Sequence, residues 1–85
     1  MAYKEITYKE FKKEVEKLGA ICKFYENVYV IYHNTVVATI FRTHPHHGVI
    51  LFQILNDTES KLLNLCCKLM QTPLKNRGEI KWKLI

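Results

Sequence analysis

The sequence lacks several features that mark common classes of enzyme and membrane protein. Its three glycines, Gly19, Gly48 and Gly78, are too scattered to form a loop that cradles phosphate. The only serine is Ser60, and no Gly-x-Ser-x-Gly nucleophile motif occurs. No apolar stretch approaches the roughly 18–20 residues that a membrane span needs, and no apolar region follows the charged N-terminus. We therefore expect a non-enzymatic cytoplasmic protein that needs no cofactor and does not enter a membrane.

Cysteine is scarce and poorly placed for cross-linking. Cys22, Cys66 and Cys67 are an odd number, and their spacing suits neither a disulfide framework nor a zinc site. A bridge between the adjacent Cys66 and Cys67 would distort a helix. The pattern favours reduced, mostly buried thiols, with a redox or metal role as the alternative.

The length and composition indicate one small globular domain spanning residues 1–85. A hydrophobic share of 48% is ordinary for a folded protein and argues against intrinsic disorder. A chain this short buries only about 60% of the surface that its unfolded form exposes. We therefore expect a single core with a thin margin of stability.

The first segment carries the signals of a helix. Thr7 and Glu10 have the spacing of a capping box, and Gly19 suits the end of the helix because it adopts positive φ without strain. Apolar residues recur at steps of three and four, which places them on one face: Tyr8, Phe11, Val15 and Leu18. Lysine and glutamate fill the solvent-facing side.

The central part of the chain changes to the pattern of strands. Residues 21–25, 28–32, 35–43 and 49–55 are rich in β-branched and aromatic side chains. Glu26-Asn27 and His33-Asn34 separate the first three, and asparagine tolerates the left-handed backbone of a tight hairpin. We predict four antiparallel strands that follow one another as a β-meander.

A second helix and a final strand complete the expected fold. Asn56 to Glu59 supply a cap and acidic first-turn residues, and Pro73 prevents the helix from continuing. Residues 79–85 alternate, with Ile80, Trp82 and Leu84 on one side and charged residues on the other. The predicted class is α+β, in the order α-β-β-β-β-α-β, with the antiparallel β-meander packed against two helices.

The loop between the third and fourth predicted strands is a candidate metal site. His44, His46 and His47 lie within four residues, and neutral imidazole binds zinc or copper. No cysteine or carboxylate lies beside them in the sequence, whereas zinc sites usually draw ligands from separate elements. We therefore favour a polar connector with no metal.

The net charge of +5 is concentrated near the C-terminus. Residues 68–85 carry five basic side chains and only Glu79 as an acid, whereas residues 20–67 are neutral overall. Lys75 and Arg77 on the predicted turn, with Lys81 and Lys83 on one face of the final strand, predict a positive stripe. This stripe is either a solvated strand edge protected by lysine or a binding site for an acidic protein surface or nucleic acid.

The tyrosines near the first hairpin leave two alternatives open. Tyr25, Tyr29 and Tyr32 either stack across the hairpin or form a patch that faces a partner. Packing within the hairpin explains them adequately, and we favour it.

Four segments together resemble small proteins encoded by phages and prophages of Gram-positive bacteria. These are residues 8–19 (YKEFKKEVEKLG), 28–32 (VYVIY), 72–77 (TPLKNR) and 81–84 (KWKL). The histidine-rich loop and the paired cysteines depart from the usual pattern of those proteins. The resemblance implies an accessory phage product that acts by binding something in the host cell, and it supplies no catalytic residue.

Two functional hypotheses follow. The first is a regulator that binds a host protein with an acidic surface and inhibits a host defence system, a CRISPR nuclease being one candidate. The second is an accessory protein that binds nucleic acid through Lys75, Arg77, Lys81 and Lys83. Monomer and homodimer are equally compatible with the sequence, because an exposed edge strand and a small core both favour self-association.

Overall fold

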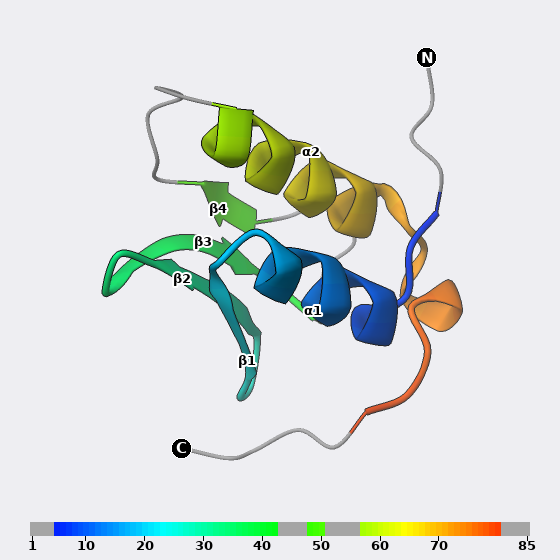
Figure 1. The fold of residues 1–85 in the computed structure, drawn as a ribbon. Helices are drawn as coiled ribbons and strands as arrows, with labels where there is room; N and C mark the ends of the chain where they lie inside the picture. Colours follow the sequence, from blue (N-terminus) through cyan, green and yellow to red (C-terminus); the bar gives the residue numbers. More distant parts are fainter. Residues whose placement is uncertain (1–4, 43–47, 51–56, 81–85) are drawn as a thin grey trace.

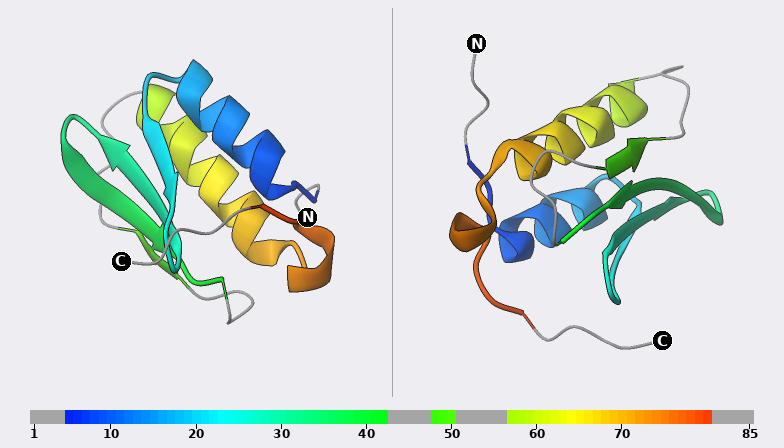
Figure 2. Two further views of the ribbon diagram at one scale, coloured as in Figure 1. Left: turned by 90° about the horizontal axis from the view of Figure 1, so that it is seen from below. Right: turned by 180° about the vertical axis from the view of Figure 1, so that it is seen from behind.

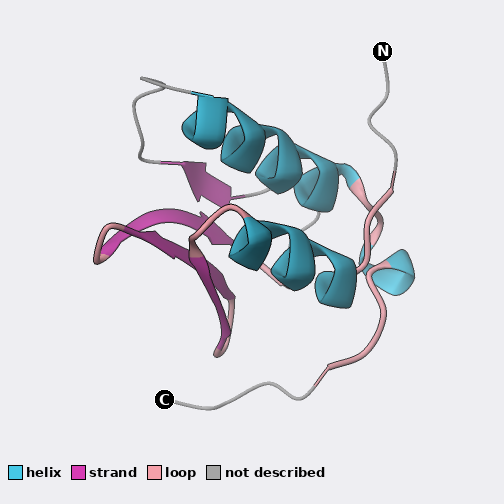
Figure 3. Cartoon of the chain, viewed as in Figure 1, coloured by secondary structure: helices cyan, strands magenta, loops and turns pink. Residues whose placement is uncertain are grey.

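The structure, a computed structural model, describes residues 5–42, 48–50 and 57–80 and confirms the α+β class (Figure 1, Figure 3). Two helices, four strands and one 3-10 turn occur in these ranges. In chain order they are α1 (Tyr8–Lys17), β1 (Ile21–Phe24), β2 (Val28–Tyr32), β3 (Thr35–Ile40), β4 (Gly48–Ile50), α2 (Asp57–Gln71) and η1 (Leu74–Asn76).

The two helices lie side by side on one face of the sheet (Figure 2). α1 packs against β1, and α2 packs against β3. The core fills the space between these layers, with Phe11, Val15, Val30, Leu62 and Leu69 among its fully enclosed side chains. The opposite face of the sheet has no helix over it in the described part of the chain.

The start and end of α1 confirm the sequence signals. The backbone N of Glu10 donates to Thr7 Oγ1 at 3.2 Å, and the backbone N of Thr7 donates to Glu10 Oε1 at 3.1 Å. This reciprocal pair is the predicted capping box. Gly19 follows the helix with φ +87°, a conformation that strains any residue with a Cβ atom.

The sheet is an antiparallel meander with strand order β1-β2-β3-β4. The β2–β3 hairpin turns at His33 and Asn34, whose φ angles of 52° and 62° match the left-handed turn that the sequence predicts. A bulge interrupts the β2–β3 register between Val30 and Ile31. The bulge leaves Val30 opposite Ala38 and places Ile31 opposite Val36.

Several predicted strand boundaries differ from the observed elements. The first strand ends at Phe24 instead of residue 25, the third ends at Ile40 instead of residue 43, and the fourth begins at Gly48 instead of residue 49. Residues 51–55 lie outside the described ranges. Glu79 and Ile80 do not belong to a strand, and the rest of the predicted final strand also lies outside those ranges. The complete predicted order is therefore not confirmed.

The end of α2 is tied to the start of α1. Thr72 is fully buried, and its Oγ1 donates to the carbonyl of Lys68 at 2.7 Å. The same oxygen accepts a hydrogen bond from the backbone N of Ile6 at 3.0 Å. Pro73 then ends the helical path, as the sequence predicts, and leads into η1. Neither described helix is long and apolar enough to cross a membrane.

Candidate functional site

Arg77 was expected on an exposed basic stripe, and that prediction is wrong. Its side chain is 0% exposed. Its Nε donates to the carbonyl of Thr72 at 2.9 Å, and Nη2 donates to that of Met70 at 3.3 Å. Nη1 donates to the carbonyl of Phe41 at 3.4 Å, and the guanidinium lies 5.9 Å from the ring centre of Tyr8. The carbonyls at the end of α2 and after β3 need hydrogen-bond donors, and the Arg77 guanidinium supplies them.

The other predicted site residues are placed only in part. Lys75 is exposed on η1, as expected. Lys81 and Lys83 lie outside the described residues, and so do His44, His46 and His47. Within residues 5–42, 48–50 and 57–80, no group of three or more histidine, cysteine or acidic side chains is arranged to hold a metal ion.

The cysteines are free thiols, as the sequence predicts, and two of them are buried. Desolvation by burial raises the pKa of Cys22 from its ordinary value of 9.0 to about 12. Burial raises the pKa of Cys66 to about 12 as well. Both thiols therefore stay protonated at neutral pH, and a protonated thiol is a poor nucleophile. Cys67 is half-buried.

We expect one thiol of the native protein to react readily with Ellman's reagent at pH 8. That thiol is Cys67, while Cys22 and Cys66 react only as fast as the protein unfolds, because both are enclosed and protonated. Absorbance at 412 nm follows the reaction, and denaturant should release the remaining thiols. Cys67→Ala removes the fast phase; a fast phase that persists in this variant would contradict the assignment.

The charged residues of α1 are sorted onto two sides of the helix. One side carries mostly lysine and faces β1 and Ile80; its members are Lys9, Lys12, Lys13 and Glu16. The other side faces α2 and carries Glu10 and Glu14, with Lys17 between the two sides. The near-zero charge of this segment in the sequence therefore conceals a positive face and a negative face.

The positive face borders a surface hollow of about 590 Å³. Phe24 from β1 and Ile80 supply apolar surface in it. Lys12 Nζ lies 5.7 Å from the ring centre of Phe24, within range of a cation–π contact. Ile80, the last residue that the structure describes, therefore lies beside the lysines of α1.

A second hollow of about 280 Å³ follows the edge of β1. It is lined by residues 21–25 and by Lys12 and Glu16 of α1. Lys12, Glu16 and Phe24 line both hollows, so the two hollows are neighbours, and together we call them the β1 groove. Among the described residues β1 pairs only with β2, which leaves its other edge without a strand partner.

An apolar row begins at the same edge on the uncovered face of the sheet. The register places Ile21 opposite Ile31 and Ile31 opposite Val36. Ile21 is 47% exposed and Val36 is 39% exposed. On the same face the rings of Tyr25 and Tyr29 lie 6.3 Å apart, so these tyrosines do pack together within the hairpin. A contiguous apolar row of this kind is typical of protein-binding surfaces.

The β1 groove combines three features that suit an extended peptide segment. A strand edge offers backbone donors and acceptors, half-buried apolar side chains offer contact area, and nearby lysines offer charge. Sequence reasoning missed this site because it treated the lysines and glutamates of the first helix as a single solvent-facing side. The site could have been predicted from the helical period, which places the lysines of α1 on one side of the helix.

Comparison with known proteins gives no assignment: no protein-family model matches this chain, and neither the curated proteins nor the solved structures contain a match.

Proposed function

We propose that this chain is a protein-binding domain whose β1 groove receives an extended acidic segment of a partner protein. The proposal rests chiefly on the edge of β1 beside the lysines of α1, which has no strand partner among residues 5–42, 48–50 and 57–80. In strand addition, main-chain hydrogen bonds supply affinity, and alternate side chains of the added strand supply specificity. Lys9, Lys12 and Lys13 would attract carboxylates and speed association.

The resemblance to phage proteins suggests where such binding takes place. A phage accessory protein of this kind would engage a host protein in the cytoplasm and inhibit a defence system, a CRISPR nuclease being one candidate. The net charge of +5 makes mimicry of nucleic acid unsuitable as the mode of inhibition. Direct contact with an acidic surface of the target is the mode that this charge favours.

A second candidate function is binding to nucleic acid. The clustering of Lys9, Lys12 and Lys13 around one hollow favours it, and the sequence proposes Lys75, Lys81 and Lys83 as further phosphate contacts. Arg77 is withdrawn from this set because it is buried. Nucleic-acid binding would weaken with salt at a slope of about −0.9 per phosphate neutralised on duplex DNA. If the protein did not bind DNA at low salt, this alternative would be excluded.

Capture from a nuclease-treated lysate of a Gram-positive bacterium tests the proposed function. The wild-type protein should retain a specific host protein, and Lys9→Glu/Lys13→Glu should reduce the retained amount at least about tenfold, because both reversals repel an acidic partner. Lys61→Glu/Lys68→Glu changes the charge equally on α2, away from the β1 groove, and should retain the protein as well as the wild type does.

Three outcomes would overturn the proposal. No retained protein would show that no such partner exists. Equal loss in both variants would show that net charge matters and the β1 groove does not. If the host protein were retained only from a lysate that had not been treated with nuclease, the nucleic-acid alternative would be favoured.

A further inference from the structure

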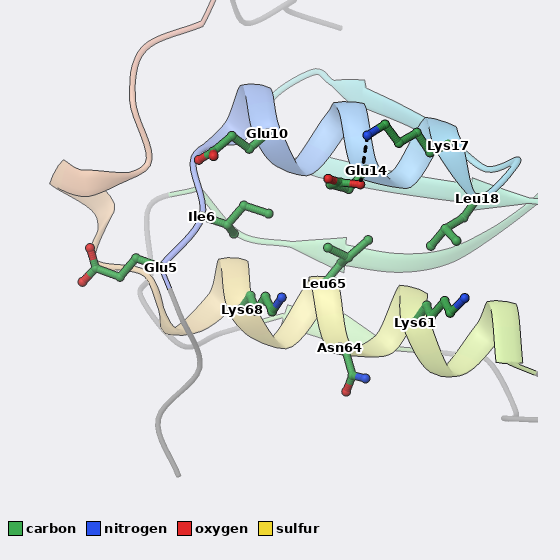
Figure 4. A pocket seen from close by; sticks show the side chains of 10 residues that line it. All are labelled: Glu5, Ile6, Glu10, Glu14, Lys17, Leu18, Lys61, Asn64, Leu65 and Lys68. Carbon is green, nitrogen blue, oxygen red and sulfur yellow. Dashed lines mark ion pairs between the residues drawn. The ribbon is translucent and has the colours of Figure 1, made fainter.

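A second groove runs between α1 and α2, on the side of α1 away from the lysine face (Figure 4). Its volume is about 610 Å³. The side chains that line it are Glu5, Ile6, Glu10, Glu14, Lys17, Leu18, Lys61, Asn64, Leu65 and Lys68. Lys17 lines both this groove and the β1 groove, and the two grooves share no other lining residue.

The two sides of this groove carry opposite charge. The α1 wall holds three carboxylates and one ammonium group, a net charge of −2 from Glu5, Glu10, Glu14 and Lys17. The α2 wall holds Lys61 and Lys68, a net charge of +2, with the polar Asn64 between them. Glu14 makes a weak pair with Lys17 on its own helix at 3.8 Å, and both side chains remain about half exposed. Each wall therefore presents its charge to solvent.

The centre of the groove is apolar. Ile6 and Leu65 are almost fully buried there, and Leu18 is half-buried. The floor of the groove is therefore apolar but offers little accessible surface, and the charged walls supply most of the surface that a partner could contact.

The two helices run in opposite directions, which determines how a copy of the same surface would fit. The start of α1 lies beside the end of α2, since Ile6 bonds to Thr72. Figure 4 shows Glu10 near the level of Lys68, Leu18 near that of Lys61, and Glu14 between the two lysines. A two-fold axis parallel to the helices would therefore place the α1 wall of one copy over the α2 wall of the other.

We propose that this face binds a second copy of the chain, forming a homodimer through the α1 and α2 walls. In this arrangement each wall of −2 meets a wall of +2, twice per dimer. A two-fold interface requires a self-complementary surface, and the equal and opposite walls satisfy that requirement within one chain. The β1 groove stays accessible, so the dimer would present it twice.

Charge swapping with sedimentation equilibrium tests this proposal. The wild type should approach twice the monomer mass of 10.1 kDa as its concentration rises. Glu5→Lys/Glu14→Lys turns the α1 wall to +2, and Lys61→Glu/Lys68→Glu turns the α2 wall to −2. Each variant alone should remain at the monomer mass, because like charges then oppose each other. An equimolar mixture of the two should recover the dimer mass, because each wall of +2 then meets a wall of −2 again.

Matched controls separate this interface from folding and from net charge. Circular dichroism should show the same helix content in each variant as in the wild type. Lys9→Glu/Lys13→Glu reverses the same number of charges on the other side of α1 and should leave the dimer mass unchanged. The proposal is overturned by a wild type that stays monomeric, by single variants that dimerise like the wild type, or by a mixture that stays monomeric. A partner captured at the β1 groove would be unaffected by any of these results.

Discussion

Arg77→Ala is expected to destabilise the fold by at least about 3 kcal/mol. The substitution removes a fully buried guanidinium and leaves the carbonyls of Thr72, Met70 and Phe41 without these donors. Those carbonyls lie in two separate parts of the chain, so the loss loosens the contact between α2 and the end of β3. A chain of 85 residues has a free energy of unfolding of about 4–13 kcal/mol, so the loss expected for Arg77→Ala is a large share of the total.

Urea denaturation followed by circular dichroism measures this effect. Lys75→Ala is the matched control, because Lys75 is exposed two residues earlier and should change stability by less than about 0.5 kcal/mol. Equal, small effects of the two substitutions would show that Arg77 does not hold the fold together.

Phe11→Ala is expected to cost about 3–5 kcal/mol. The Phe11 ring is 0% exposed and lies where α1 meets the rest of the core. Removing it leaves a cavity that α1 can fill only by losing its alignment on the sheet.

Phe24→Ala is the matched control for Phe11. Phe24 is only half-buried, and its ring makes an edge contact with Tyr8 at 5.8 Å between ring centres. Its loss should cost about 1–2 kcal/mol, measured by the same urea titration. If Phe24→Ala proved as damaging as Phe11→Ala, the assignment of Phe11 to the centre of the core would be wrong.

Local signals in the sequence were sufficient to predict much of the fold. Thr7, Glu10 and Gly19 define the ends of the first helix by hydrogen bonding and backbone freedom, which depend on only a few neighbouring residues. His33 and Asn34 define the β2–β3 turn in the same way. These predictions are confirmed because each requirement is met within four residues of chain.

The predictions that were wrong or incomplete depended on contacts between distant parts of the chain. Arg77 follows a turn and is surrounded by polar residues, which indicated exposure. Its carbonyl partners reach back as far as Phe41, and no local pattern reports that approach. The β1 groove likewise needs α1, β1 and Ile80 to meet, and it appears only once the chain is folded.

The sorting of charge around α1 links the two proposals. Its lysine face lines the β1 groove, and its glutamate face lines the groove toward α2. The same ten-residue helix would therefore contact an acidic partner on one side and a second copy on the other. Charge reversal on one face should leave the other interaction intact, which makes the two proposals separable by experiment.

The most direct test of the proposed binding site is a nuclear magnetic resonance titration of the labelled protein with a short peptide that alternates valine and glutamate. The backbone amide signals of residues 21–25 and of the lysine face of α1 should shift, because an added strand pairs with the edge of β1. The matched peptide with lysine in place of glutamate should cause little change. Shifts confined to other surfaces, or equal shifts with both peptides, would contradict the assignment of the β1 groove as an acidic-segment binding site.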